Sequence, residues 1–377
     1  MTLEETRNEI DKLDDEILKL FLRRMELCGE AAMAKKQCGR PIIDKSRERE
    51  ILRTVSEKSG DMSVYARRLF REIMSLSRSY QGILSDTETE LSENIKKFFL
   101  KDELFPKAAS VACQGIEGAY SQQAADKLFP HGNISYFNTF DDVGQAVRSG
   151  KCDYGVLPVE NSSYGSVHAV YDILKEGGLA VVRSLKLRIR HELLARPGTK
   201  LSDVREIVSH EQAIGQCGRF LKGLGEKVKI STCANTAVAA RYAAENEGTA
   251  AISSPNCAEL YGLVPLTDES IQDSDSNYTR FICVSPKPEI YPGANRISFL
   301  ASCRHEPGEL YRLISIIGAM DVNILKIESR PIPGRDFEFM FVFDIEASVR
   351  EPGIIGMLEE FKRNSESFVF LGNYQEI

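Results

Sequence analysis

The 377-residue sequence lacks tryptophan, long apolar segments and closely spaced cysteine pairs, and the last two absences exclude whole classes of protein. No run of about 18 apolar residues occurs, which argues against a membrane-spanning helix. The first 15 residues are charged and lack the apolar core of a signal peptide, so we expect a cytoplasmic protein. The nine cysteines are scattered and none forms a Cys-x-x-Cys pair, which predicts reduced core thiols rather than disulfides or a metal site.

The sequence also lacks an excess of positive charge, since it contains 48 Lys and Arg and 55 Asp and Glu. The net charge of −7 argues against nucleic acid or an anionic membrane as the main partner. Residues 1–84 nevertheless carry 17 Lys and Arg against 15 Asp and Glu, a net +2 within the acidic whole. With 42% hydrophobic residues, the length predicts a folded enzyme of two or three domains.

The first segment, residues 1–84, is predicted to be entirely helical. Thr2 and Glu5 have capping-box spacing, and a heptad of apolar a and d positions continues to Cys38. The heptad positions are Leu3, Ile10, Leu13, Ile17, Leu20, Leu27, Ala31 and Ala34. Such a helix is on the order of 50 Å long, which exceeds an 84-residue core, so we expect an intertwined homodimer. Shorter helices are expected at 44–58 and 64–84, the last capped by Ser63.

Polar side chains recur at helical spacing within this segment. Arg24 occupies an a position, where a guanidinium needs an anion, and Lys35 returns to the same face. Arg7 points elsewhere, as a residue reaching a partner chain would. Further sets at i, i+3 or i+4 are Asp44, Arg47 and Glu48, and Ser77 and Gln81. Each residue alone could belong to a solvated face.

Together these eight residues resemble the site of the all-helical chorismate mutases. The resemblance implies that the arginines clamp a dicarboxylate in its reactive conformer, and that Lys35 and Gln81 stabilise charge on the breaking ether oxygen. It also implies that Arg7 enters the other subunit's site. The substrate-binding set is Arg7, Arg24, Lys35, Asp44, Arg47, Glu48, Ser77 and Gln81.

The rest of the chain divides into four parts. Residues 85–107 are polar and predict a linker, partly helical. Residues 108–284 alternate strands, at 110–113, 154–158, 206–209 and 250–253, with helices, which predicts a largely parallel α/β sheet. Within it, Lys186, Arg188 and Arg190 are expected on the solvated face of a strand. Residues 285–292 predict a second linker, and 293–377 follow the βαββαβ order of a ferredoxin-like domain.

Five motifs in the middle part resemble prephenate dehydratase. They are Gly115-Ile-Glu-Gly-Ala-Tyr-Ser121, Pro158-Val-Glu-Asn-Ser162, Ser209-His-Glu-Gln-Ala-Ile-Gly-Gln-Cys217, Asn235-Thr-Ala-Val-Ala and Asn277-Tyr-Thr-Arg-Phe281. The first three follow strands and open toward helices, where free backbone N–H groups suit an anion. Ser121, Ser162 and Thr236 could equally be helix caps.

The resemblance implies a two-lobed fold like that of periplasmic binding proteins and gives Thr279 the central role. Its hydroxyl would polarise the leaving hydroxyl of prephenate within a network of Glu160, Asn161 and Gln216. The group that supplies the proton stays open. Implied substrate-binding residues are Ser121, Asn161, Ser162, Ser209, His210, Gln212, Thr236 and Arg280.

The C-terminal part resembles an ACT regulatory domain, through His305-Glu-Pro-Gly308-Glu-Leu and Glu328-Ser-Arg-Pro331. Glu309 departs from the family, which more often has Ala there. The resemblance implies a phenylalanine site; a purely dimerising role is the alternative. The implied residues are Glu306, Pro307, Gly308, Leu310, Asn323, Glu328, Ser329, Arg330 and Pro331.

Taken in order, the segments resemble the bifunctional chorismate mutase/prephenate dehydratases of phenylalanine biosynthesis. This implies chorismate and prephenate as substrates, feedback by phenylalanine, and a homodimer, or a tetramer if the C-terminal domains also pair. Neither reaction needs an electron sink, so we expect no cofactor and no metal. Arogenate dehydratase activity and a cytosolic small-molecule sensor are the alternatives.

Overall fold

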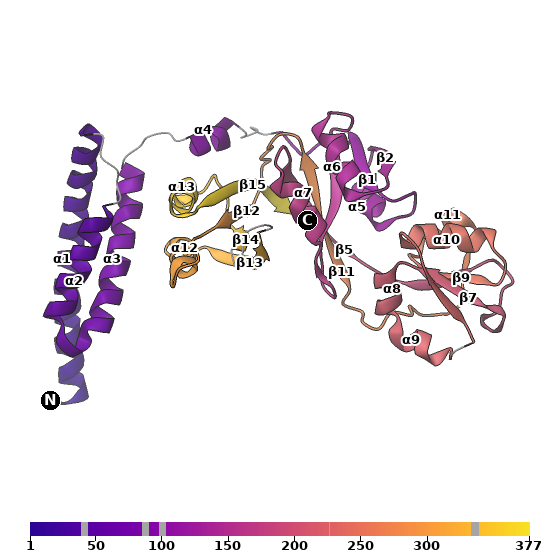
Figure 1. The fold of residues 1–377 in the computed structure, drawn as a ribbon, viewed down its shortest axis with the longest axis horizontal. Helices are drawn as coiled ribbons and strands as arrows, with labels where there is room; N and C mark the ends of the chain where they lie inside the picture. The colour runs from indigo at the N-terminus through magenta and orange to yellow at the C-terminus, as the bar shows by residue number, and fades with distance from the viewer. Residues whose placement is uncertain (39–43, 85–89, 98–102, 226, 333–338) are drawn as a thin grey trace. The chain divides into compact units, whose positions relative to one another are not determined.

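The computed structural model describes residues 1–38, 44–84, 90–97, 103–225, 227–332 and 339–377. Contacts divide the chain into two compact units. Figure 1 labels the helices and strands that they contain. The first unit contains residues 1–97 and 301–368, and the second contains 98–300 and 369–377. The predicted C-terminal segment therefore contributes residues to both units.

The first unit begins with three long helices, α1 (Leu3–Gln37), α2 (Lys45–Lys58) and α3 (Ser63–Leu84), with a 3-10 turn at Gly60–Met62. The 35 residues of α1 make it about 52 Å long. Thr2 and Glu5 form the predicted capping box, and the all-helical prediction is confirmed. The prediction of Ser63 as an N-cap is wrong, because its backbone is already helical (φ −57°, ψ −35°).

The same unit contains α4 (Glu90–Lys97), which lies in the predicted linker and packs on α13 (Ile354–Asn364). Leu91 and Ile95 of α4 are buried, and the backbone N–H of Ser92 donates to the Glu359 carboxylate of α13 at 3.0 Å. The linker is thus partly helical as predicted, and this helix is docked rather than solvated.

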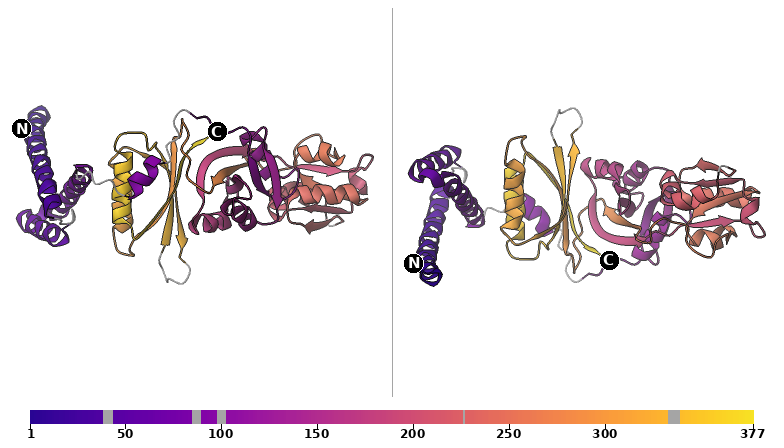
Figure 2. Two further views of the ribbon diagram at one scale, coloured as in Figure 1. Left: turned by 90° about the horizontal axis from the view of Figure 1, so that it is seen from above. Right: turned by 90° about the horizontal axis from the view of Figure 1, so that it is seen from below.

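The C-terminal segment has the predicted βαββαβ order. Its elements are β12 (Arg296–Ser302), α12 (Glu309–Gly318), β13 (Asn323–Pro331), β14 (Phe339–Glu346), α13 and β15 (Ser367–Glu376). The strand order is β13-β14-β12-β15, and α12 lies beside α13 on one side of the sheet (Figure 2). β15 is longer than the predicted 368–371, and its end pairs in parallel with β5, Gln375 opposite Arg183.

The second unit has two lobes, and the strands of the two lobes belong to two different sheets. The first lobe contains β1 (Ser110–Gln114), α5 (Tyr120–Leu128), β2 (Asn133–Phe137), α6 (Phe140–Arg148), β3 (Tyr154–Asn161), β4 (Gly165–Ser166), α7 (His168–Lys175), β5 (Ala180–Arg188) and β11 (Tyr278–Ser285). Its strands lie in the order β5-β11-β3-β1-β2. Only β1 with β2 and β1 with β3 are parallel along this path, because β11 returns from the other lobe antiparallel to both β3 and β5. The expected largely parallel sheet is therefore mixed.

The second lobe lies between β5 and β11 in sequence. It contains β6 (Glu192–Ala195), a 3-10 turn (Leu201–Asp203), β7 (Glu206–Ser209), α8 (Glu211–Gln216), α9 (Gly218–Gly223), β8 (Lys229–Thr232), α10 (Thr236–Glu245), β9 (Thr249–Ser253), α11 (Asn256–Tyr261) and β10 (Val264–Pro265). The strand order is β10-β6-β9-β7-β8. Two chain segments, 189–191 and 266–277, connect the lobes.

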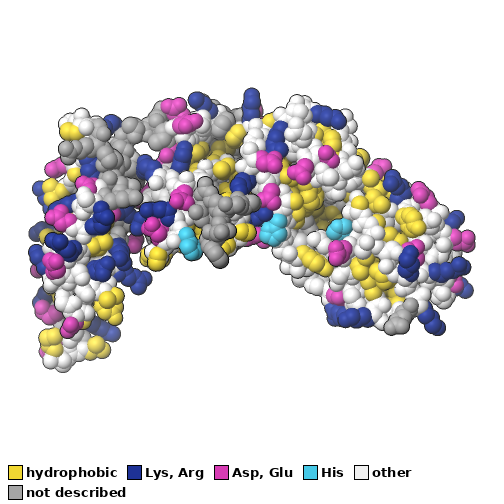
Figure 3. Space-filling model, in the orientation of Figure 1, with side chains coloured by type: hydrophobic (Ala, Val, Ile, Leu, Met, Phe, Trp, Pro, Cys, Tyr) yellow, Lys and Arg dark blue, Asp and Glu magenta, His cyan; other side chains and the backbone are white. Residues whose placement is uncertain are grey.

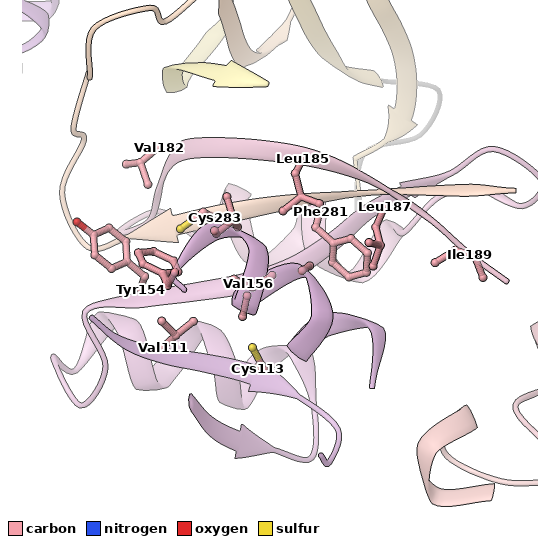
Figure 4. Packing of buried hydrophobic residues seen from close by; sticks show 14 residues of the cluster. Val111, Cys113, Tyr154, Val156, Val182, Leu185, Leu187, Ile189, Phe281 and Cys283 are labelled. Atoms are coloured by element: carbon pink, nitrogen blue, oxygen red, sulfur yellow. The ribbon is translucent and has the colours of Figure 1, made fainter. Parts of the chain in front are cut away.

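The core of the first lobe lies against its central strands (Figure 4). Val111, Val156 and Leu185 are at most 2% exposed there. At the edge of this core, the Tyr154 and Tyr291 hydroxyls both donate to Glu289, at 2.7 and 2.8 Å. Glu289 and Tyr291 belong to the predicted linker 285–292, so this stretch is part of the lobe's packing instead of a free connection.

The surface carries charged side chains of both signs, as expected from 48 Lys and Arg and 55 Asp and Glu in the sequence. Lys, Arg, Asp and Glu side chains are interspersed on the face that Figure 3 shows. Lys186, Arg188 and Arg190 are exposed as predicted, although Lys186 also pairs with Glu376 at 3.1 Å. Across the described ranges, no helix is long and apolar enough to cross a membrane.

Candidate active sites

A cavity of about 370 Å³ lies between the two lobes of the second unit. The first lobe contributes strand ends and the start of α5; the second contributes α8 and the start of α10. Polar side chains in its wall are Gln114, Tyr120, Ser121, Asn161, His191, His210, Gln212, Gln216, Asn235, Thr236 and Thr279. No Lys, Arg, Asp or Glu lines the cavity among the described residues.

Thr279 and Asn161 form the polar centre of the first-lobe wall. They lie directly opposite each other in the antiparallel pairing of β11 with β3, so their side chains share one face. The Asn161 amide donates to Thr279 Oγ1 and to Asn277 Oδ1, each at 2.9 Å. Its carbonyl oxygen accepts from the backbone N–H groups of Ser163 and Tyr164, which fixes the orientation of the amide. With a lone pair engaged by Asn161, the Thr279 hydroxyl can donate its hydrogen into the cavity.

Glu160 and Arg280 lie on the opposite face of the same strands. They are also cross-strand neighbours, and their charged groups are 4.0 Å apart. Since successive side chains of a strand alternate, Glu160 and Arg280 turn away when Asn161 and Thr279 face the cavity. The structure therefore brings Asn161, Thr279 and Gln216 to one cavity and leaves Glu160 and Arg280 outside its wall.

The remaining predicted dehydratase residues separate into two groups. Ser121, His210, Gln212 and Thr236 line the cavity. Ser209 is fully buried behind it and donates to the Ile252 carbonyl at 2.6 Å, while the Ser162 hydroxyl donates to the Ser276 carbonyl at 3.0 Å. Ser121, Ser162 and Thr236 are not helix N-caps. The N-cap is Ala119 for α5, Val167 for α7 and Asn235 for α10.

Two further residues, His191 in the cavity wall and Tyr164 beside the cavity, were not predicted from the sequence. His191 lines the cavity from the segment 189–191, and its Nε2 lies 2.7 Å from Gln216 Oε1. Tyr164, in the turn after β3, reaches α8, where a methyl group built on Gly215 would collide with its hydroxyl. The sequence signal for His191 was weak: it directly follows the alternating stretch that ends at Arg190.

Burial controls the electrostatics of the cleft. Desolvation lowers the pKa of His191, and a hydrogen bond with Gln216 opposes this only in part. Desolvation also lowers the pKa of His210, with the nearby Glu211 carboxylate opposing it. Both histidines are therefore neutral at physiological pH, and the cavity wall offers amides, hydroxyls and helix N-termini rather than charges.

In the helical part of the first unit, Arg24, Ser77 and Gln81 come together. The Arg24 guanidinium donates to the Ser77 hydroxyl, which itself donates to the Ile73 carbonyl at 2.6 Å. Ser77 and Gln81 are 4% and 8% exposed, one turn apart on α3. The Gln81 carbonyl oxygen is buried and has no hydrogen-bond partner among the described residues.

Of the other predicted mutase residues, Asp44 and Glu48 form hydrogen bonds at the start of α2, and Arg7 lies far from Arg24 along α1. Asp44 caps α2 through the Arg47 N–H, and this hydrogen bond is the main reason that its pKa is lowered, with the Lys35 charge adding to the effect. Glu48 accepts from Arg78 at 2.7 Å, an arginine that the sequence analysis did not select. Arg7 precedes Arg24 by 17 residues on one straight helix, about 25 Å, so it cannot join Arg24 within one chain.

In the C-terminal segment, a cavity of about 410 Å³ is lined by residues of the loop 303–307, by Leu310 of α12 and by β14, and it includes Glu306 and Pro307. Gly308 is the N-cap of α12 and has φ +88°. Phe339 and Phe341 of β14 line the cavity, and Pro331 and Ser329 lie opposite them in the neighbouring strand β13. Glu328 points to the other face of β13 and forms an ion pair with Lys326 at 3.1 Å. Arg330 lies on the same face of β13 as Glu328, and the Asn323 amide donates to Glu346 at the far end of the strand. Glu309 is buried between Arg304 and Arg312, at 3.5 and 3.2 Å.

Comparison with known proteins decides the family. Residues 111–289 match the prephenate dehydratase family model, and 6–82 match chorismate mutase type II. An arogenate dehydratase/prephenate dehydratase of Arabidopsis thaliana is 34% identical over 74% of this chain and 80% of its own length. The chain belongs to the prephenate dehydratase family.

The match extends to the helical part. The bifunctional chorismate mutase/prephenate dehydratase of Aquifex aeolicus is 29% identical over 99% of this chain and 97% of its own. Among solved structures, prephenate dehydratase of Arthrobacter aurescens in complex with L-Phe is 28% identical, with a TM-score of 0.64 over 70% of this chain and 89% of that one. These findings confirm the predicted bifunctional chorismate mutase/prephenate dehydratase of phenylalanine biosynthesis.

Proposed function

We propose that this chain converts chorismate to prephenate with its N-terminal helices and prephenate to phenylpyruvate in the cavity between the lobes, with phenylalanine as inhibitor. The observation that carries the dehydratase assignment is the Asn161–Thr279 hydrogen bond in a cavity whose described wall residues include no Lys, Arg, Asp or Glu. It leaves a hydroxyl donor facing a space large enough for a small dicarboxylate.

Dehydration of prephenate requires that its ring hydroxyl become a better leaving group. As the ring carboxylate departs as carbon dioxide, its electron pair enters the ring, the ring carbon–oxygen bond breaks, and the hydroxyl leaves as water after gaining a proton. Asn161 holds the Thr279 oxygen as an acceptor, so the Thr279 hydroxyl donates a hydrogen bond to the departing oxygen and keeps its own proton. An alcohol is too weak an acid to transfer that proton, so the proton that completes the water molecule comes from another source. This interaction strengthens as negative charge develops there.

The two carboxylates of prephenate can be bound without cations. The helices α5 and α10 begin at the cavity from opposite lobes, and their first N–H groups have no partner within the helix. The positive ends of both helix dipoles thus face the cavity. Ser121, Asn235 and Thr236 add side-chain donors at the same places.

The neutral wall also favours prephenate over arogenate. Arogenate carries an ammonium group where prephenate has a ketone, and a buried ammonium needs a carboxylate partner. In the part of the chain that the structure describes, no Asp or Glu lines the cavity. A comparison of kcat/KM for the two substrates tests this, and a higher value for arogenate would overturn the preference.

For the mutase, the cluster of Arg24, Ser77 and Gln81 supplies one guanidinium and hydrogen-bonding groups in a mostly buried setting. A rearrangement without proton transfer needs only such positioning and charge stabilisation. The Arg24 guanidinium would bind one substrate carboxylate. Lys35 and Gln81 would face the ether oxygen whose bond breaks.

A homodimer would complete this site. Apolar heptad residues of α1 are exposed in the single chain, with Leu3 at 69%, Ile17 at 59% and Leu20 at 70%. Burial of this stripe against a second copy is worth about 25 cal/mol per Å². It would also bring the partner's Arg7 to the Arg24 cluster.

Phenylalanine binding is proposed for the C-terminal cavity at Glu306, Pro307 and Leu310. The βαββαβ order with strands β13-β14-β12-β15 supports an ACT domain. The complex of the Arthrobacter relative with L-Phe supports this ligand. Because the end of β15 pairs with β5 of the dehydratase lobe, a shift of that strand could reach the cleft.

The test is a coupled assay from chorismate to phenylpyruvate, with and without phenylalanine. We expect phenylpyruvate to form and phenylalanine to suppress it. Accumulation of prephenate would overturn the dehydratase assignment. Arg24→Ala should abolish the mutase and leave conversion of added prephenate unchanged; an equal loss of both activities would contradict separate sites.

A further inference from the structure

His191 has no part in the function proposed above, yet it occupies a central position in the dehydratase cleft. It lies in the segment 189–191, one of the two connections between the lobes, and lines the cavity. The residue is only 2% exposed. Buried polar side chains are normally hydrogen-bonded, so the hydrogen-bond partners of His191 indicate its role.

The backbone of His191 is held by the other connection between the lobes. Its N–H donates to the Gln272 side chain at 3.2 Å, and its carbonyl accepts from Ile271 N–H at 3.2 Å and from the Ser270 hydroxyl at 2.8 Å. The ring stands edge-on to Tyr120, with centroids 6.1 Å apart. The imidazole therefore has a fixed place where the lobes meet.

The His191 ring nitrogen Nε2 forms a hydrogen bond with Gln216 Oε1, and the other ring nitrogen, Nδ1, is buried and has no partner among the residues that the structure describes. Because burial lowers its pKa, the ring is neutral and carries one proton. If that proton were on Nδ1, a buried N–H would have no acceptor, which is costlier than an unused lone pair. The proton therefore belongs on Nε2, and the Gln216 carbonyl oxygen accepts it.

This assignment determines what Gln216 presents to the substrate. With its oxygen turned to His191, the amide NH₂ of Gln216 has no hydrogen-bond partner among the described residues. The Gln216 backbone is held as well, since its carbonyl accepts from Asp273 N–H at 2.7 Å. Gln216 then faces the cavity as a donor, the polarity that a dicarboxylate or a departing hydroxyl needs.

We propose that His191 is a positioning residue that fixes the Gln216 side chain as a hydrogen-bond donor toward prephenate. The proposal rests on the dehydratase function proposed above. It makes His191 necessary for the reaction although the imidazole transfers no proton itself. Without the Nε2–H donor, the Gln216 amide can rotate and offer its oxygen to the anionic substrate.

Two variants separate this role from simple packing. His191→Met fills a similar volume without a donor, whereas His191→Gln keeps an N–H at the position of Nε2. We expect His191→Met to lower kcat/KM for prephenate by about tenfold to a hundredfold, the range for losing one oriented buried hydrogen bond. His191→Gln should recover activity to within about threefold of the original, by the same reasoning. His131→Met, on an exposed turn, is the matched control.

The mutase reaction of the same chain reports on folding, and it should be unchanged in every variant. Gln216→Leu should also be impaired, and His191→Met should then add little, because the two side chains act as one unit. Equal losses in His191→Met and His191→Gln, or full activity in both, would overturn the proposal. If the unmodified protein fails to convert prephenate, the proposed function fails before any variant is compared.

The tautomer gives an independent readout. With only five histidines, ¹⁵N-histidine labelling and two-bond imidazole correlations should resolve the His191 ring. We expect a neutral Nε2–H form near pH 7 in the full-length protein, and its loss in His191→Gln assigns the signal. A neutral Nδ1–H form would overturn the proposal, whatever the kinetics show.

Discussion

At the scale of single residues, the sharpest expectation concerns the Thr279 hydroxyl. Thr279→Val keeps the shape of the side chain and removes the donor that Asn161 orients. We expect kcat for dehydration to fall by at least about a hundredfold, as for loss of an oriented catalytic donor. Steady-state kinetics with prephenate measure it, with mutase activity as the folding control. Thr279→Ser should retain most activity, and an active Thr279→Val would refute the role.

A second residue-scale expectation concerns closure of the cleft. Tyr164 rests on Gly215, and any side chain at that position would collide with its hydroxyl. Gly215→Ala should displace Tyr164 and raise KM for prephenate about fivefold or more, since roughly 1 kcal/mol of binding corresponds to fivefold. Tyr164→Ala alone should raise KM by a similar amount, and adding Gly215→Ala to it should then change KM little, because no hydroxyl is left to collide with. If Gly215→Ala raises KM as much in the Tyr164→Ala background as in the original protein, the collision is not the cause.

The dehydratase residues show what a motif can and cannot predict. The motif around Pro158 to Ser162 identified Asn161, but it also suggested its neighbour Glu160, which alternates to the opposite face. Which of two adjacent strand residues faces a cavity depends on pairing with another strand. That register includes an irregularity between Arg280 and Phe281, which a single sequence does not reveal. His191 was missed because its partner, Gln216, is 25 residues away in sequence.

At the scale of elements, local signals predicted well and long-range pairing poorly. The capping box and heptad predicted α1 to within one residue at its end. The predicted strand 368–371 ends before β15 does, since β15 continues to Glu376. Gly372 is needed where β15 passes β5, because a Cβ there would collide with the Val181 carbonyl oxygen. The contact that requires this glycine involves a strand almost 200 residues earlier.

The docking of α4 on α13 leads to a prediction about pH. Burial raises the pKa of Glu359, while the Ser92 N–H and nearby cations oppose the shift. A raised pKa in the folded state means that the contact is strongest below the ordinary glutamate pKa and weakens as the pH rises through the folded value. Glu359→Gln keeps an acceptor for Ser92 and removes the charge, so it should strengthen docking above that pH.

Hydrogen exchange of residues 90–97 measures this docking. At pH 8, we expect α4 in Glu359→Gln to be protected about fivefold more than in the unmodified protein, an effect of roughly 1 kcal/mol. At pH 4 the two proteins should converge. Glu346→Gln, at an exposed position on β14, is the control. Equal protection at both pH values would show that ionisation of Glu359 does not weaken the contact.

At the scale of the whole molecule, the boundaries expected from sequence and the compact units differ. Three segments were expected, but contacts join the N-terminal helices with residues 301–368 and leave 369–377 with the dehydratase lobes. Two elements account for this: α4 docks on α13, and the end of β15 pairs with β5. Composition marks where a chain is polar, whereas a domain boundary depends on which distant surfaces bury each other.

The last prediction concerns assembly of the mutase site from two chains. Arg7 and Arg24 are about 25 Å apart on α1, so a site that uses both must take Arg7 from the partner. Arg7→Ala and Arg24→Ala homodimers should each be inactive as mutases. In a mixed dimer, the Arg24 of one chain meets the Arg7 of the other in one of the two symmetric sites. Co-expressed variants should therefore recover about a quarter of the original mutase activity, from random pairing of equal amounts. Absence of recovery in mixed dimers isolated with two affinity tags would show that Arg7 does not act across the interface.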